Sequence, residues 1–303
     1  MAADQSLVNA LFGAVIVFFG LLLFMEIWHP YNSVGAKALK QSYATNTMAF
    51  LFNNVIMSIL SVSSLLVVAG EYSQYGLLGG VSDGVVKWVL SFVLFDFAVY
   101  SWHYVGHHSE FLWRFHKIHH SDKSFHVMTG LRFHVFDQLL EVVVNCICVV
   151  LIGVNTPTVV VCEVLRMAFV LFHHSNLSFP GEKWLSYVII TPSLHRTHHS
   201  TRREDHDSNY GIVLSVWDLM FETRKELATD TIGLEMVEAN NLVQLFCLAF
   251  VTERRLARLL HKLPRRRRQA EQPIEDNRYH QLSRRRATPG LQATAISDDR
   301  ARR

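Results

Sequence analysis

Long apolar blocks alternate with polar segments along the first two thirds of the chain. The stretch from Leu7 to Trp28 contains one charged residue, Glu26, close to its end. That length and purity are typical of a membrane-spanning helix. The stretch from Met48 to Gly70 has no charged residue, and the one from Val85 to Tyr104 has two. The pattern therefore predicts three spanning helices.

Two weaker apolar runs follow, from Gln138 to Val154 and from Thr158 to Phe172, and each contains charged or amide side chains. The three residues between them end in Pro157, which favours a tight connection. We expect these runs to form a helical hairpin buried within the bundle, giving about four to five spans in total.

Histidines recur at spacings that suit a metal centre. In a helix, positions i, i+3 and i+4 share one face, so an H-x-x-H-H motif would aim three imidazoles at one point. Eight neutral imidazoles are too many for one four-ligand zinc site and suit two metal ions that each keep a coordination position open. Two irons fit that number best. Two H-x-x-H-H motifs and one H-x-x-x-H supply these side chains: His103, His107, His116, His119, His120, His195, His198 and His199.

Composition agrees with a membrane location, because half of the residues are apolar and the mean hydropathy is +0.17. Every histidine motif follows an odd number of predicted crossings, so all can lie on one side. Lys37, Lys40 and the basic tail follow odd crossings too, and the positive-inside rule makes that side cytoplasmic. The N-terminus is then expected outside, and the first span is not expected to be a cleaved signal peptide because no basic segment precedes it.

The sequence divides into four parts. We expect N-terminal transmembrane helices over 1–95, a catalytic domain with the membrane hairpin over 96–225, an interfacial helix over 226–253 and a basic, disordered tail over 254–303. The tail contains runs of three and four arginines, and beside a membrane domain we expect it to approach anionic headgroups rather than nucleic acid. The four cysteines form no C-x-x-C pair and predict no chemistry.

The residues around the histidines resemble a known family. The tracts DFAVYSWHYVGH, LWRFHKIHHSD, TGLRFH, HHSN, TPSLHRTHHS and NYGIVLSVWD, spread over about Asp96 to Thr223, are similar to the fatty acid hydroxylase and sterol desaturase superfamily of integral-membrane di-iron oxygenases. The resemblance implies that the eight histidines are iron ligands, and it adds His134 and His174 as further candidates. The chain departs from the family pattern at Tyr104, at Val135 and at Glu222, which replaces a usual glycine.

Polar side chains near the motifs are candidates for orienting the ligands through their second ring nitrogens. Asp207 is weighed against an ordinary turn in the sequence DSNYG, and direct metal binding is the less favoured reading for His108, His126, His173 and His206. The orienting candidates are Asp96, Asp122, Asp137, Asn209 and Asp218.

Together these features predict an all-α, polytopic membrane helical bundle with a cytoplasmic, histidine-rich helical cap around a di-metal site. With O2 as cosubstrate, two iron ions would hydroxylate or desaturate a C–H bond of a lipid, such as a sterol, a fatty acyl chain or an ether lipid. No G-x-G-x-x-G motif is present, so a separate electron donor is implied, a small cytochrome or ferredoxin with its reductase. It would dock near Arg114, Lys117 or Arg196.

Two other classes of protein stay open. A membrane metal transporter or sensor without oxygenase activity would also place histidines near the bilayer, although transport favours ligands spread along a pathway. A bis-histidine membrane cytochrome is disfavoured by the adjacent His119 and His120 outside the spans. Iron without a haem absorption band, and lipid-dependent oxygen consumption, would separate these classes.

Overall fold

The computed structural model is a bundle of long helices with a cap of short ones. It describes residues 2–60, 64–227, 229, 231–237 and 239–261, and within those ranges it contains isolated β-bridges but no strand. The all-α prediction is confirmed. The long helices are α1 (Ala2–Trp28), α2 (Ala36–Ile59), α4 (Val85–His108), α6 (Val135–Ile152) and α7 (Thr156–His174).

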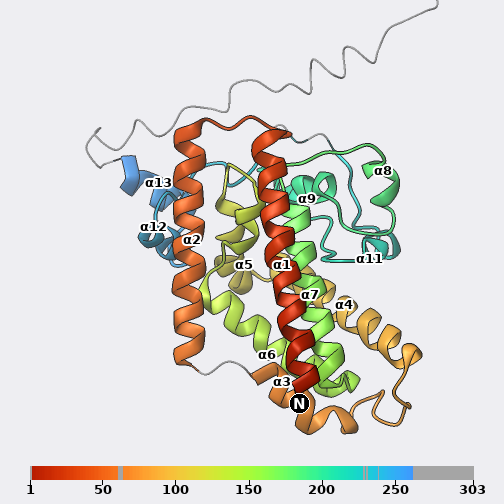
Figure 1. The fold of residues 1–303 in the computed structure, drawn as a ribbon. Helices are drawn as coiled ribbons and strands as arrows, with labels where there is room; N and C mark the ends of the chain where they lie inside the picture. Colours follow the sequence, from red (N-terminus) through yellow and green to blue (C-terminus); the bar gives the residue numbers. More distant parts are fainter. Residues whose placement is uncertain (1, 61–63, 228, 230, 238, 262–303) are drawn as a thin grey trace, which may run out of the picture.

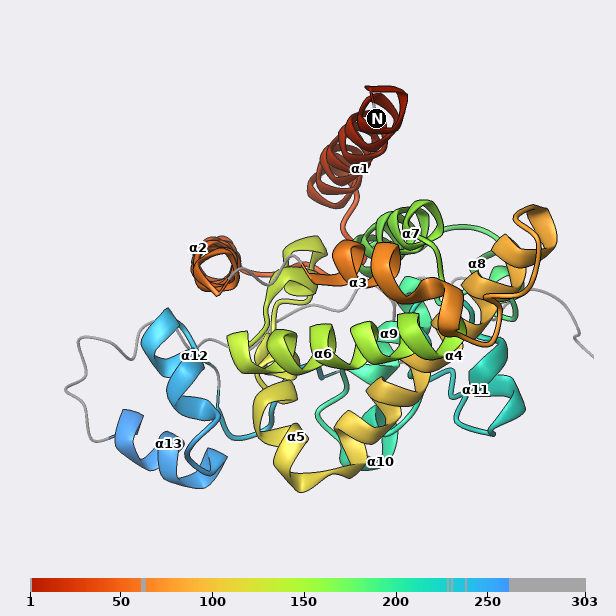
Figure 2. The same ribbon diagram turned by 90° about the horizontal axis from the view of Figure 1, so that it is seen from below.

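Among the described residues, four helices are long and apolar enough to cross a membrane: Val8–Trp28, Val85–His108, Val135–Ile152 and Thr156–His174. They lie in α1, α4, α6 and α7, and the protein is an integral membrane protein. α1 packs against α7, and α4 packs against both α6 and α7 (Figures 1 and 2). Large apolar side chains on α1, such as Ile16 and Trp28, are about two-thirds exposed, at 70% and 68%, as expected of a face that contacts lipid.

The expected second span does not form one helix over Met48–Gly70. α2 ends at Ile59, and α3 (Ser64–Tyr72) is a separate short helix that packs on α6 and α7. α2 instead begins twelve residues earlier than the apolar run, and in its first half the polar side chains of Ser42, Thr45 and Asn46 are buried on one face. α1 and α2 run in opposite directions in Figure 1, so the chain still returns to the N-terminal end before α4.

The α6–α7 hairpin was predicted by its turn residues. Gly153 caps the end of α6 with φ 83°, in the left-handed region that glycine adopts without strain. Asn155 caps the start of α7, where its side chain accepts a hydrogen bond from the Thr158 backbone N–H at 3.2 Å. Inside the hairpin, Arg166 forms ion pairs with Glu141 at 2.8 Å and Glu163 at 2.7 Å.

Short helices form the cap over one end of the bundle. They are α5 (Glu110–His116), η2 (His119–Ser121), η3 (Val127–Leu131), α8 (Glu182–Leu185), α9 (Pro192–His198), α10 (Arg203–His206), α11 (Val216–Met220), α12 (Leu242–Leu248) and α13 (Glu253–His261). The short helix η1 (Ser73–Tyr75) lies at the other end, where it packs on α6 and α3 beside the α6–α7 turn.

The interfacial helix expected over 226–253 stays a prediction. Within 226–253, α12 is the helix that the described residues form before α13 begins, and the apolar side chains of Leu234 and Val237 are buried against Phe115 and Ile118 of the cap. These side chains cover protein rather than lipid. The start of the predicted tail is helical in α13, whereas residues 262–303, with both arginine runs, lie outside the described residues.

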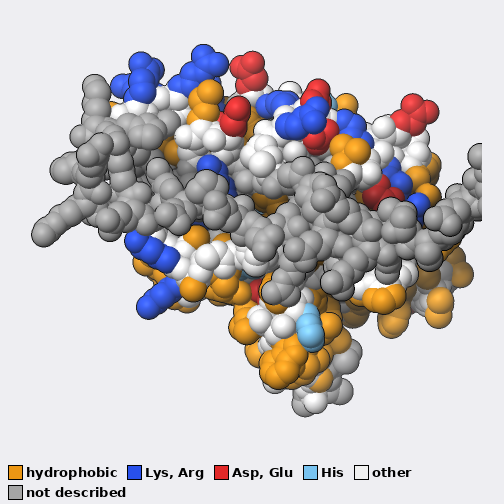
Figure 3. All heavy atoms as spheres, turned by 90° about the horizontal axis from the view of Figure 1, so that it is seen from above, with side chains coloured by type: hydrophobic (Ala, Val, Ile, Leu, Met, Phe, Trp, Pro, Cys, Tyr) orange, Lys and Arg blue, Asp and Glu red, His pale blue; other side chains and the backbone are white. Residues whose placement is uncertain are grey.

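The end of the molecule where α1 meets α2 is charged. In Figure 3, lysine, arginine, aspartate and glutamate side chains gather along the upper edge of this face and further lysine or arginine side chains lie at its left, whereas the lower projection is mostly hydrophobic. Charged side chains avoid the hydrocarbon layer, so these parts of the surface are expected to lie in water.

Candidate metal centre

Nine histidines converge in two adjacent groups beneath the cap. Within each group, the ring nitrogens that could bind a metal all lie within 4.8 Å of one another. The first group is His103, His107, His116, His120 and His198. The second group is His119, His174, His195 and His199.

The structure therefore brings together all eight histidines of the three motifs and adds His174 from the end of α7. It does not assign one motif to one group. α5 ends at His116, and the following 3₁₀ turn points the neighbours His119 and His120 into different groups. In the other H-x-x-H-H motif, His195 and His199 share one group and His198 joins the other.

Backbone carbonyls fix the protonation state of several ring nitrogens. The Nδ1 atoms of His103, His119, His174 and His198 lie 2.6–3.3 Å from the carbonyl oxygens of Tyr210, Arg132, Val170 and Ser208, respectively. A carbonyl only accepts, so each Nδ1 must carry the proton and donate it. Each Nε2 atom of these four neutral rings is then an unprotonated acceptor aimed into its group.

Facing lone pairs are the feature that decides what the groups hold. His119 Nε2 lies 3.0 Å from His174 Nε2, and both atoms are unprotonated because the Nδ1 atom of each ring carries the proton. Two lone pairs at that distance repel unless a cation lies between or beside them. His174 Nε2 is also 3.0 Å from His195 Nε2. The second group thus has the donors of a metal site.

The first group shows the same property. His103 Nε2 and His116 Nε2 are 3.2 Å apart, and the Nδ1 of His116 lies 3.2 Å from Asp137 Oδ2. Within the described residues, the buried Nε2 atoms of His107, His120 and His198 have no hydrogen-bond partner. A buried polar atom without a partner is costly, and a metal ion would satisfy all three.

Electrostatics keep these imidazoles in the form that binds metal. Burial, followed by the proximity of other imidazoles, holds the pKa values of His119, His120, His195, His198 and His199 well below the ordinary 6.5. At neutral pH the rings are neutral and their nitrogen lone pairs are free to coordinate.

The remaining candidate histidines lie outside the two groups. His134 caps α6, with Nδ1 accepting from the Phe136 backbone N–H at 3.1 Å, and its ring contacts Phe115 and Phe246. Burial lowers the pKa of His134 to about 4. His173 lies against His195 with 4.0 Å between ring centroids, and His108 is exposed on α4.

His206 lies at the edge of the first group. It forms a third set of potential donors with His107 and Asp207. The Asp207 carboxylate already contacts His107 Nδ1 at 3.2 Å and forms an ion pair with Arg203 at 2.9 Å. This set therefore orients His107 and needs no ion of its own.

Two of the orienting candidates contact or nearly contact histidine rings, and the others hold loops. Asp137 contacts His116, and Asp122 lies 3.8 Å from His126 Nε2. Asp96 accepts a hydrogen bond from Trp217 Nε1 at 2.8 Å. It also accepts from the backbone N–H groups of Val213 and Leu214, which precede Trp217 in the chain. Asp218 accepts from the backbone N–H of Tyr210, whose carbonyl orients His103.

Asn209 and Glu222 both have a positive φ. At Glu222 the family resemblance had led us to expect glycine. Asn209 Nδ2 donates to the carbonyls of Leu194 and Lys225, and its φ is 55°. Glu222 has φ 58°, in the left-handed region that favours glycine. A non-glycine residue in this region carries some backbone strain.

Comparison with known proteins agrees with the geometry. Residues 88–223 match the fatty acid hydroxylase family. This segment is a fatty acid hydroxylase domain. It contains all nine converging histidines, namely the eight of the three motifs and His174.

Three curated relatives that match this segment are named as two hydroxylases and a monooxygenase. The chain is 33% identical over 135 residues to ornithine lipid hydroxylase OlsE of Rhizobium tropici, covering 45% of this chain and 40% of that protein. It is 25% identical over 207 residues to alkylglycerol monooxygenase of Danio rerio, covering 68% and 46%. It is 23% identical over 138 residues to cholesterol 25-hydroxylase of Rattus norvegicus, covering 45% and 45%. The matches span less than half the length of these relatives. No solved structure matches the chain.

Sequence reasoning missed Arg132 and the polar residues of α2. Arg132 is 1% exposed, and its carbonyl orients His119. A signal was present in the spacing of Ser42, Asn46 and Asn53, which are polar residues on one face of α2 and are all buried.

Proposed function

We propose that this protein is a membrane-bound, O2-dependent lipid hydroxylase with two iron ions held by the two histidine groups. The observation that carries the proposal is the pair of facing, unprotonated nitrogens at His119 and His174, which calls for a cation. Imidazole ligands suit iron. The five imidazoles of the first group and the four of the second would each hold one iron ion, and the two ions would supply the activation of O2.

Hydroxylation is favoured over desaturation. The three relatives described above are named as two hydroxylases and a monooxygenase, and their substrates are an ornithine lipid, an alkylglycerol and cholesterol. We infer a lipid substrate for this chain as well. The reaction balances as one C–H bond, one O2, two electrons and two protons giving one alcohol and one water.

When bound, the iron ions supply the activation of O2 and the oxidation of the C–H bond. The protein positions the imidazoles and keeps water out of the centre. His107, His120 and His198 are 1% exposed or less, so bulk water is excluded from the centre. The carbonyls of Tyr210, Arg132, Val170 and Ser208 keep the Nδ1 protons in place, which leaves every Nε2 directed at the metal positions.

The electrons come from a separate one-electron carrier, a small cytochrome or ferredoxin with its reductase. Lys117 and Arg196 are 7% and 4% exposed and so do not offer a docking surface, whereas Arg114 is exposed. The partly exposed ring of Trp113 lies 5.0 Å from the ring of His107 and 5.2 Å from that of His120. We infer that the carrier docks beside Trp113 and Arg114.

Lys37 and Lys40 lie near the start of α2, at the end of the molecule where α1 meets α2, so the positive-inside rule favours the cytoplasmic side for the metal centre and the tail. Labelling single introduced cysteines in intact cells tests this orientation. Labels at residue 37 should be protected from an impermeant reagent, and accessibility there would reverse the orientation.

The activity is tested with purified protein in lipid nanodiscs, a chemical reductant and ¹⁸O2. We expect two irons per chain, no haem absorption band, and a lipid product carrying one ¹⁸O atom. His119→Ala and His120→Ala should abolish the product, whereas His108→Ala, which changes an exposed ring on α4, should retain it. Bound metal with no lipid product under reductant and O2 would instead favour a transporter or sensor.

A further inference from the structure

The polar face of α2 is unusual for a helix beside a membrane bundle. Ser42, Thr45, Asn46 and Asn53 are all at most 5% exposed. Burying a polar side chain is unfavourable unless it is hydrogen-bonded. α2 also lies outside the matched hydroxylase domain, so its role in the site is not implied by the family match.

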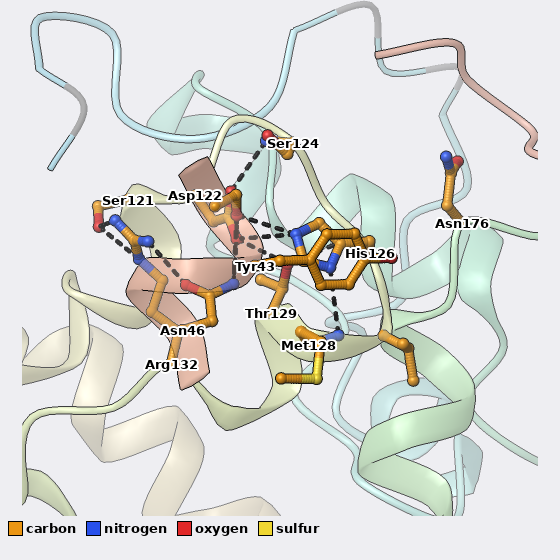
Figure 4. Close-up of polar contacts among 12 residues, drawn as sticks. Tyr43, Asn46, Ser121, Asp122, Ser124, His126, Met128, Thr129, Arg132 and Asn176 are labelled. Carbon is orange, nitrogen blue, oxygen red and sulfur yellow. Dashed lines mark hydrogen bonds and ion pairs between the residues drawn. The ribbon is translucent and has the colours of Figure 1, made fainter. Parts of the chain in front are cut away.

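Two of these residues, one helical turn apart, converge on Asp122. The hydroxyl of Ser42 donates to the carboxylate at 2.8–2.9 Å. Asn46 Nδ2 donates to Oδ2 of the same carboxylate at 2.7 Å (Figure 4). Thr129 Oγ1 and the Ser124 backbone N–H also donate to this carboxylate, at 2.9 and 3.0 Å. Burial alone would raise the pKa of Asp122, but the charge of Arg132 and the hydrogen bonds from these donors hold it below its ordinary value.

Asn46 joins this carboxylate to a buried guanidinium. Its Oδ1 accepts from Arg132 NH1 at 2.8 Å, while its Nδ2 donates to Asp122. The other guanidinium nitrogens donate to Ser121 Oγ at 3.0–3.1 Å and to the Ala239 carbonyl at 2.7 Å. A single amide therefore satisfies a buried cation and a buried anion at once, which an apolar side chain cannot do.

The same arginine fixes a histidine of the second group. The carbonyl of Arg132 accepts from His119 Nδ1 at 3.3 Å, and its Nε donates to the Ile118 carbonyl at 3.3 Å, directly before His119. The ring of Phe133 stacks on His119 with centroids 4.6 Å apart. The backbone carbonyl of Arg132 thus orients the His119 imidazole, and the side chain of Arg132 fixes the backbone of Ile118, the residue before His119.

The Ser42, His126 and Asp122 side chains do not form a nucleophilic triad. His126 Nε2 faces both Ser42 Oγ at 2.9 Å and Asp122 at 3.8 Å, whereas its Nδ1 accepts from the Met128 backbone N–H at 3.3 Å. A relay would need the carboxylate on the opposite ring nitrogen. The cluster is therefore a support and not a second active site.

We propose that Asn46 is a positioning residue for the second metal position, acting through Arg132 on His119, and that α2 is part of the metal centre. This inference rests on the proposed function, in that both histidine groups must hold metal. Hydrogen-bond partners behind a metal ligand typically change metal affinity by about 10–100-fold.

The experiment is a cobalt(II) titration of the purified, metal-free full chain in nanodiscs, followed by the visible spectrum of each bound ion. His174→Ala and His103→Ala assign the spectral components to the second and first groups. Asn46→Leu should weaken binding at the second position by about 10–100-fold and leave the first unchanged. Ser42→Ala, which removes one donor to Asp122, should weaken the same position less.

Thr45→Val is the matched control. Thr45 lies on the same face and is 1% exposed, but its Oγ1 has no hydrogen-bond partner among the described residues. This nearly isosteric change should keep both cobalt affinities.

Wild-type affinity at both positions in Asn46→Leu would overturn the inference, as would equal weakening at both positions together with a lower melting temperature. If Asn46→Leu does not fold, Ser42→Ala decides by the same criterion. Failure of the wild type to bind two ions would instead overturn the proposed function and this inference with it.

Discussion

Acidifying the metal-free protein should destabilise it steeply, because the fold buries neutral imidazoles that the unfolded chain would protonate. Five of them, outside the spanning helices, have pKa values well below 6.5 because of burial and neighbouring rings: His119, His120, His195, His198 and His199. For a depressed histidine, stability is present above the unfolded pKa and is lost as the pH falls below it.

The magnitude follows from the unfolded state. At pH 5.5, one unit below the ordinary pKa, an imidazole that stays neutral in the fold is protonated about ten to one when unfolded, a cost of about 1.4 kcal/mol. Five such groups sum to about 7 kcal/mol, which is comparable with the whole stability of an ordinary domain. We therefore expect the melting temperature to fall by more than about 10 °C between pH 7.5 and 5.5.

The assay is thermal unfolding of chelator-treated protein in detergent, followed by tryptophan fluorescence across this pH range. His120→Phe removes one of the five titrating rings and should reduce the loss by about 1.4 kcal/mol. A melting temperature that does not change from pH 7.5 to 5.5 would refute the reasoning, since it would mean that the rings are not buried together without metal.

Three further outcomes are expected. Asp137→Asn removes the carboxylate that holds His116 Nδ1 at 3.2 Å, so cobalt titration should show about 10–100-fold weaker binding at the first group, and unchanged affinity would contradict this. His134→Ala should cost about 1 kcal/mol of stability through the lost helix cap and keep two metals per chain, whereas His174→Ala should lose one, both measured by metal analysis. Arg166→Met leaves two carboxylates unpaired inside the α6–α7 hairpin and should lower stability by about 3–5 kcal/mol, seen in thermal unfolding, whereas replacing all three charged residues by leucine should recover most of the loss.

The sequence predicts the membrane bundle well because its signal is local. A long apolar run specifies a helix whatever surrounds it, as in α1, and a turn such as that at Gly153 and Asn155 specifies its own geometry. The histidine motifs were equally visible, since ligand spacing requires no knowledge of the fold. His174 was predicted as a candidate ligand only through the family resemblance.

The partition of the ligands between the two groups was not predictable from spacing. An ideal helix through His116, His119 and His120 would place all three on one face. The structure ends α5 at His116 and continues in a 3₁₀ turn, so the rings diverge. The helix ends there because Ser121 and Asp122 are needed by a tertiary network, with Ser121 accepting from Arg132 and Asp122 from Asn46.

The same tertiary demand explains the error at the second span. The apolar run from Met48 to Gly70 has the composition of one helix, yet α2 is set earlier in the chain by polar residues that hydropathy counts as unfavourable. Ser42 and Asn46 are buried because Asp122 needs their donors, a requirement carried by a residue about 80 positions away. Hydropathy windows do not contain such pairs.

Metal binding and folding are therefore expected to be coupled in this protein. The second group is built from four rings on three separate segments, at His119, at His174 and at His195 with His199, and two of its nitrogens face each other as lone pairs. Without an ion, that arrangement is held against repulsion by the carbonyls of Arg132 and Val170 and by the packing behind them. With an ion, the same contacts become the source of its affinity. The buried Asp122, Asn46 and Arg132 network is then the part of the fold that keeps the site formed before the metal arrives, and α2 is required for the centre although the hydroxylase domain begins after it.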